Sequence, residues 1–156
     1  MKRRAFTLIE LLVVISIIGL LSTIAVVATN ASRAEARDAK RIADLKQIST
    51  AVELYIDANN ITPRGGASWC TYISNASNGW GAAFQADLAP YLAHTPLDPT
   101  KHNQVGDYLF DNDNVFQRGT QYILCANLER STGNSYDKTN CAGGVVYNYC
   151  IYPNGK

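Results

Sequence analysis

The sequence lacks the short motifs that mark most enzymes and metal centres. It has no CxxC pair, no glycine-rich phosphate loop and no GxSxG nucleophile turn. Its two histidines, His94 and His102, lie far in sequence from every cysteine, which argues against a zinc site. The formal net charge is only +1 over 156 residues, so no overall field favours nucleic acid. We therefore expect a protein that is not an enzyme.

Acidic residues offer a single candidate for a metal site. Asp107, Asp111 and Asp113 follow one another closely, and Ca²⁺ binds hard oxygen donors of this kind. The twelve-residue calcium-loop pattern is absent, because its bidentate glutamate is missing. We expect a turn here and no cofactor, with calcium as the alternative.

Charge is almost absent between Phe6 and Ala28, where Glu10 is the single ionisable residue. A bilayer core takes about 20 helical residues, so this apolar run is long enough to span a membrane. Three basic residues precede the run, and they predict a cytoplasmic N-terminus: Lys2, Arg3 and Arg4. A secretory signal peptide usually has a shorter apolar region. A plain membrane anchor leaves Glu10 unexplained, because a carboxylate is costly in hydrocarbon.

The stretch AFTLIELLVVISIIG, residues 5–19, resembles the N-terminal motif of type IV pilins and type II secretion pseudopilins. The resemblance implies cleavage between Ala5 and Phe6, N-methylation of Phe6, and pairing of Glu10 with the N-terminal amine of a neighbouring subunit. At Ala5 the family most often has glycine. An ammonium group and a carboxylate are each costly in lipid, and each satisfies the other when paired. The resemblance thus gives Glu10 an assembly role.

The same resemblance implies partners and a location. We expect a single-pass protein of the bacterial cytoplasmic (inner) membrane, which later forms a periplasmic or cell-surface filament. Its partners would be further copies of itself, other pilins, the prepilin peptidase/methyltransferase, the assembly platform and the lipid bilayer. DNA is a further partner that no sequence feature supports. The alternatives are a type II secretion pseudopilin and a membrane-anchored binding domain that does not polymerise.

Helical periodicity continues beyond the apolar run. Apolar residues recur at spacings of three and four and predict a buried stripe: Ile42, Leu45, Ile48, Val52, Tyr55 and Ile56. Neither glycine nor proline occurs from Leu20 to Ile61, so one helix of about 50 residues is predicted. Charged residues at 33–46 form either a solvated face, which we expect, or salt bridges between subunits: Arg33, Glu35, Arg37, Asp38, Lys40, Arg41, Asp44 and Lys46.

The remaining residues predict a small antiparallel β head, and an α+β, pilin-like fold overall. We divide the chain into a leader (1–5), a membrane or filament-core half of the helix (6–28), an amphipathic half (29–61) and a head (62–156). The head is expected to contain a short helix, a hairpin turn and three strands: Phe84–Leu92, Asp111–Asn114, Asp107–Phe110, Thr120–Asn127 and Gly144–Tyr152. Tyr108 alternates with Phe110, and Tyr147 with Tyr149, as on half-buried strands.

Four cysteines follow the apolar run: Cys70, Cys125, Cys141 and Cys150. An even number in a translocated domain predicts two disulfides formed in an oxidising compartment. Four cysteines allow three pairings, and the sequence does not choose among them.

Overall fold

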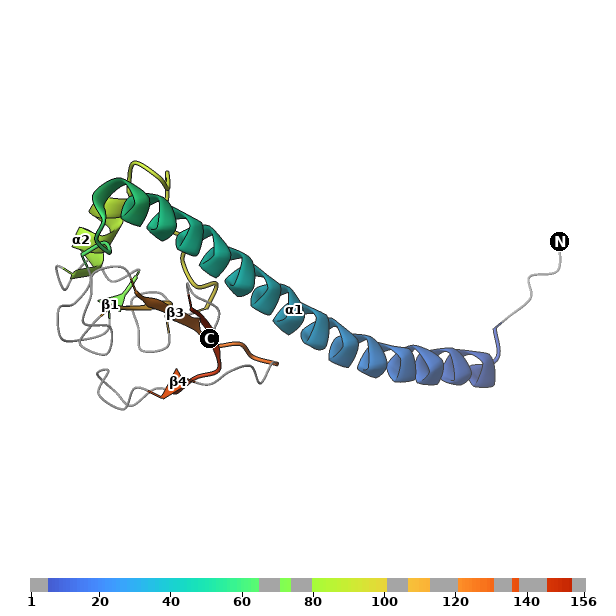
Figure 1. Ribbon diagram of the computed structural model, residues 1–156. Helices are drawn as coiled ribbons and strands as arrows, with labels where there is room; N and C mark the ends of the chain where they lie inside the picture. The colour runs from blue at the N-terminus through green and yellow to red at the C-terminus, as the bar shows by residue number, and fades with distance from the viewer. Residues whose placement is uncertain are drawn as a thin grey trace. The chain divides into compact units, whose positions relative to one another are not determined.

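The computed structural model describes residues 6–64, 71–73, 80–100, 107–112, 121–130, 136–137 and 146–152. The chain divides into two compact units, Met1–Ala36 and Arg37–Lys156, and each is described here by itself. Helix α1, Leu8–Asn59, contributes residues to both units (Figure 1). The α+β expectation is confirmed, since a long N-terminal helix packs on a small antiparallel sheet.

The single long helix predicted from the sequence is present. α1 has 52 residues, close to the length expected from the absence of glycine and proline. It ends where Asn60 adopts the left-handed conformation, at φ 55°. The amide of Asn60 donates a 2.7 Å hydrogen bond to the carbonyl of Ile56, which caps the helix. Asparagine tolerates this conformation better than most residues, which explains the stop just before Pro63.

The second unit adds helix α2, Trp80–Leu88, and six short strands. The strands are β1 Thr71–Tyr72, β2 Leu109–Asp111, β3 Ile123–Ala126, β4 Tyr136–Asp137, β5 Val146–Tyr147 and β6 Tyr149–Ile151. Four of them form an antiparallel sheet in the order β1-β2-β3-β6, and β4 pairs with β5.

One face of the sheet packs against α1 and α2. The predicted stripe supplies Leu45, Ile48 and Val52, all fully buried, and Ala51 joins them. The strand side chains that meet them alternate along β2 and β3, as period-two geometry requires: Tyr108, Phe110, Tyr122, Leu124 and Ala126. Phe110 lies between Phe84 and Tyr122, with ring centroids 4.5 and 5.8 Å away.

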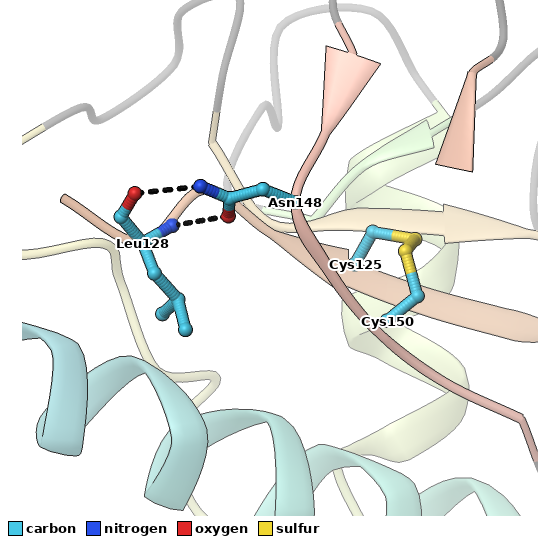
Figure 2. Close-up of a disulfide and its surroundings, with 4 residues drawn as sticks. All are labelled: Cys125, Leu128, Asn148 and Cys150. Carbon is cyan, nitrogen blue, oxygen red and sulfur yellow. Dashed lines mark hydrogen bonds between the residues drawn. A yellow bond between two sulfur atoms is a disulfide. The ribbon is translucent and has the colours of Figure 1, made fainter. Parts of the chain in front are cut away.

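The opposite face of the sheet is also buried. Its core contains Tyr72, Leu109, Ile123, Cys125, Tyr147 and Cys150. Cys125 and Cys150 are direct partners across β3 and β6 and form a disulfide, with their Cα atoms 4.2 Å apart (Figure 2). Neighbouring strands bring opposed Cα atoms about this close at non-hydrogen-bonded positions. The sheet register therefore decides the pairing that the sequence left open.

Several local predictions were wrong. β1 and β4 were not expected, because two residues are too few to give a period-two pattern. The predicted strand at Gly144–Tyr152 is interrupted at Asn148, so Tyr147 and Tyr149 belong to different strands and pack on different clusters. Asp111 ends β2 and is not in a turn. α2 starts earlier than expected and stops at Leu88, because Pro90 disfavours helix at the residue before it.

Candidate functional site

The N-terminal part of α1 presents a largely apolar surface. α1 is the single helix in the described residues that is long and apolar enough to cross a membrane, by length and composition only. Its most apolar window has a mean hydropathy of 2.8, and none of that window is buried within the chain. The large side chains from Phe6 to Val26 are exposed, Phe6 by 81% and Leu12 by 55%. Such a surface needs lipid or another protein to cover it.

Hydroxyl groups within this segment bond to the helix itself. Ser16, Ser22 and Thr23 donate to the carbonyls of residues three or four positions earlier, at 2.7–2.8 Å. Thr29 and Ser32 do the same at 2.7 and 3.1 Å. Because each hydroxyl already has an acceptor, none needs water or a neighbouring chain. The segment therefore suits an apolar environment in spite of its five hydroxyls.

Glu10 takes part in a capping box at the start of α1. The amide and hydroxyl of Thr7 donate to the Glu10 carboxylate at 2.9 and 2.7 Å, and the Glu10 amide donates to the Thr7 hydroxyl at 3.3 Å. The T-x-x-E spacing is the known signal for this arrangement, and our reading of the sequence missed it. Glu10 thus has a partner within its own chain, which lowers the cost of placing a carboxylate near an apolar segment.

In the second unit, the charged residues of α1 hold loops of the head. Arg41 is 2% exposed and donates to the carboxylate of Asp98 at 2.7 Å and to Asp38 at 2.9 Å. It also reaches Glu129 at 3.0 Å and the hydroxyl of Thr100 at 2.8 Å. Asp38 in turn accepts the backbone amides of residues 129 and 130 at 2.8 and 2.9 Å. We call these residues the Arg41 cluster: Asp38, Arg41, Asp98, Thr100 and Glu129.

Arg37 strengthens this cluster from one turn earlier. Its guanidinium binds both oxygens of Glu129, at 2.7 and 2.5 Å, in a two-pronged pair. The hydrogen bond from Arg37, with a second from Arg41, lowers the pKa of Glu129 from 4.5 to about 2. Burial works against the charge of Arg41, but hydrogen bonds to Asp98 and Glu129 raise its pKa above the ordinary value. Arg41 and Glu129 therefore remain charged at neutral pH.

Two further polar contacts join α1 to the sheet. The Tyr108 hydroxyl donates to Asp44 at 2.7 Å, and Lys40 bonds the same carboxylate at 2.7 Å. The Tyr122 hydroxyl donates to Glu53 at 2.8 Å.

The expectation of a solvated charged face was therefore wrong for Asp38 and Arg41, which are buried. Arg37, Lys40 and Asp44 also bond to residues of their own chain. Apart from the local Lys40–Asp44 and Arg41–Asp38 pairs, their partners lie 57 to 92 residues away along the chain, and helical spacing carries no signal for such pairs.

The other predicted site residues are divided between described and undescribed parts of the chain. Ala5, Cys70, Asp113 and Cys141 lie outside the described residues, as does His102. Asp107 and Asp111 are both buried. In the part of the chain that the structure describes, no three His, Cys, Asp or Glu side chains gather as metal ligands would. The calcium alternative thus stays untested.

A side-chain bridge next to the disulfide extends the sheet. The Leu128 amide donates to Asn148 Oδ1, and Asn148 Nδ2 donates to the Leu128 carbonyl, each at 2.7 Å (Figure 2). Asn148 lies between β5 and β6, so its carboxamide replaces a backbone partner where the strand is broken. This contact holds the backbone of Leu128, the residue before Glu129.

Comparison with known proteins identifies the N-terminal segment. Residues 1–26 match the family model described as the prokaryotic N-terminal methylation motif, which is the prepilin-type signature of type IV pilins and pseudopilins. No curated protein and no solved structure matches the chain. The motif and the apolar helix together fit a membrane-anchored, pilin-like or pseudopilin-like prepilin of a structural rather than enzymatic family.

Proposed function

We propose that this chain is the structural subunit of a type IV pilus-like filament. It enters the bacterial cytoplasmic membrane as a prepilin with its N-terminus inside. Hydrolysis of the Ala5–Phe6 bond then consumes one water and leaves a free amine on Phe6. That amine receives a methyl group from the donor used by the prepilin peptidase/methyltransferase. The observation that supports this proposal is the methylation motif on a helix whose apolar side chains have no cover within the chain.

Polymerisation would cover the apolar surface of α1 with the same segment of neighbouring copies. The amine of Phe6 on one subunit would pair with Glu10 of the next, because both groups are costly when unpaired in an apolar core. The Thr7–Glu10 capping box supports this step, since it holds the carboxylate in place at the beginning of the helix. Because pilin-like prepilins are processed and then assembled at the membrane, we also propose that the prepilin peptidase cleaves this chain. A membrane assembly platform would then add it to the filament.

A glutamine at position 10 distinguishes the two roles of Glu10, which are pairing with the amine of a neighbouring subunit and capping of α1. Glutamine can serve as the third helical residue of a capping box but carries no charge. We therefore expect Glu10→Gln and Glu10→Ala to insert into the membrane and yet fail to give filaments. Thr7→Ser, which preserves the cap, should assemble as the unmodified chain does. Filaments from Glu10→Gln, but not from Glu10→Ala, would reduce the role of Glu10 to capping.

Intact mass under non-reducing conditions tests the processing steps. The processed chain should begin at Phe6, carry one added methyl group and be four hydrogens lighter than its fully reduced form. Recovery in a sheared surface fraction favours a surface pilus, and retention in the envelope favours the type II secretion pseudopilin. A chain that begins at Met1 and functions without Glu10 would instead be a membrane-anchored binding domain that does not polymerise.

A further inference from the structure

The disulfide between Cys125 and Cys150 skips a cysteine. Cys141 lies between them in the sequence, nine positions from Cys150 and sixteen from Cys125. The linked residues are 25 positions apart, so Cys141 is nearer in sequence to each of them than they are to each other. The pairing that the sheet register imposes is therefore not the one that sequence order favours.

Before the sheet forms, the length of the loop decides which cysteines meet most often. The entropic cost of closing a loop rises as three halves of the logarithm of its length. The short loop between Cys141 and Cys150 therefore closes about five times as often as the loop between Cys125 and Cys150. In an unfolded chain under oxidising conditions, Cys150 thus forms its first disulfide mainly with Cys141.

After the sheet forms, the native link is closed to exchange. Cys125 is fully buried and Cys150 is only 5% exposed, in a core that contains Leu109, Ile123 and Tyr147. Thiol–disulfide exchange requires a thiolate to reach one of the two sulfur atoms. An earlier link therefore has to be opened before this face of the sheet is covered.

Contacts of β3 and β6 select the native partner without any cross-link. The register places Ala126 opposite Tyr149 and Cys125 opposite Cys150. Two hydrogen bonds of 2.7 Å between Leu128 and Asn148 continue the same pairing (Figure 2). These contacts favour the native pair once Cys150 is free, but they supply no group that opens a link to Cys141.

We propose that this chain is a substrate of a thiol–disulfide isomerase outside the cytoplasmic membrane, where the proposed function places the head. A thiolate of the isomerase attacks the Cys150 sulfur of the Cys141–Cys150 link, and Cys141 leaves as a thiolate that takes up a proton. The Cys125 thiol loses a proton and attacks the same Cys150 sulfur, and the isomerase leaves in its original reduced form. The exchange involves no net oxidation.

The first link needs a separate oxidant. Joining Cys141 to Cys150 removes two electrons and two protons from two thiols, and a disulfide-bearing oxidase of the same compartment accepts them. The chain therefore depends on two reactions in sequence, an oxidation that is indifferent to the fold and an exchange that the fold directs.

The experiment compares bacterial cells that have or lack their extracytoplasmic disulfide isomerase, each expressing the full-length chain. Free thiols are alkylated at lysis, and a non-reducing peptide map gives the fraction of Cys150 linked to Cys125. We expect that fraction to fall about fivefold without the isomerase, with a peptide joining Cys141 to Cys150 in its place. An unchanged fraction would overturn the proposal, and so would a loss without the Cys141–Cys150 peptide.

Two variants that differ only at position 141 show whether Cys141 is the competitor. Cys70→Ser retains Cys141 and should need the isomerase as the unmodified chain does. Cys70→Ser/Cys141→Ser leaves Cys125 and Cys150 with no other partner, so its link should form equally in both kinds of cell. Equal dependence of the two variants on the isomerase would contradict the exchange step.

Refolding of the reduced full chain in mild detergent tests the chemistry without any filament. A mixture of reduced and oxidised glutathione should give the native link, and oxidised glutathione alone should leave Cys141 linked to Cys150. Equal native yields from the two would overturn the proposal. A chain that keeps its leader and forms no filament, but needs exchange in this assay, would overturn the proposed function alone.

Discussion

Arg41 places a positive charge among buried side chains and faces three carboxylates. Two of them, Asp38 and Asp98, are buried with it, and Glu129 is one-third exposed. Replacing a buried ion pair as a whole by apolar residues can be neutral, but removing one partner leaves an uncompensated charge. The Arg41 side chain therefore supplies the positive charge that the two buried carboxylates face.

We predict that Arg41→Ala lowers the free energy of unfolding by about 3 kcal/mol or more, because Asp38 and Asp98 lose their counter-charge. The measurement is a denaturant titration of the full chain in mild detergent, followed by near-ultraviolet circular dichroism. Lys46→Ala, an exposed cation on the same helix, should change stability by less than about 0.5 kcal/mol. Equal midpoints for the two variants would show that the cluster does not hold the helix.

Glu129 gives the cluster a defined dependence on pH. Its pKa falls from 4.5 to about 2 on folding, so the folded state favours the charged form. That contribution is complete above about pH 4.5 and is lost as the pH falls towards 2. Its size is of the order of 1–2 kcal/mol after allowance for solvent at this partly exposed side chain. Glu129→Gln should therefore be less stable than the unmodified chain at neutral pH, with the difference shrinking below pH 4. A constant difference across that range would contradict the assignment.

At the residue scale, the sequence predicts contacts that depend on local spacing and does not predict contacts that depend on the tertiary fold. Leu45, Ile48 and Val52 followed from helical spacing, which is a local property. Asp98 and Glu129 lie 57 and 88 residues from Arg41, so their pairing depends on the tertiary fold. Thr7 was different, because T-x-x-E is a local signal that could have been read.

At the scale of elements, the register of β3 and β6 determines which cysteines form a disulfide, because it places Cys125 opposite Cys150. Cys125 and Cys150 are buried in the core on the face of the sheet opposite α1 and α2. Their disulfide links residues that are 25 positions apart in the sequence. Cross-linking at this separation contributes about 3 kcal/mol in the chain-entropy account. Helix α1 could be predicted from composition and period, whereas two-residue strands have no period, and only their pairing reveals them.

We predict a second disulfide between Cys70 and Cys141, the two cysteines that the first pairing leaves over. A non-reducing peptide map should show Cys125 linked to Cys150 and Cys70 linked to Cys141, and no other linked pair. Cys125→Ala/Cys150→Ala should lower the free energy of unfolding by about 3 kcal/mol, from loss of the cross-link and of buried sulfur. Cys70→Ser/Cys141→Ser is the matched control and should leave the Cys125–Cys150 link intact. Recovery of any peptide that joins Cys125 to a cysteine other than Cys150 would contradict the register of β3 and β6.

At the scale of the molecule, the two units differ in where their apolar side chains lie. The first exposes its apolar side chains and contributes none of the described buried core. In the second, the core begins at Leu45 and uses both faces of the sheet, and the Arg41 cluster closes it towards the N-terminal side of that helix segment. The first unit therefore governs solubility, and the second governs folding.

We predict that a chain of residues 29–156 folds without detergent. It keeps two helical turns before Arg37, so the pair with Glu129 is not at a frayed end, and it retains every buried side chain that the structure describes. It should be monomeric by sedimentation, form the Cys125–Cys150 link and unfold in one cooperative transition. The full chain should remain with the membrane or detergent fraction, because its exposed apolar segment is costly in water. Aggregation of the shortened chain, with its disulfide absent, would show that the second unit needs the apolar half of α1 in order to fold.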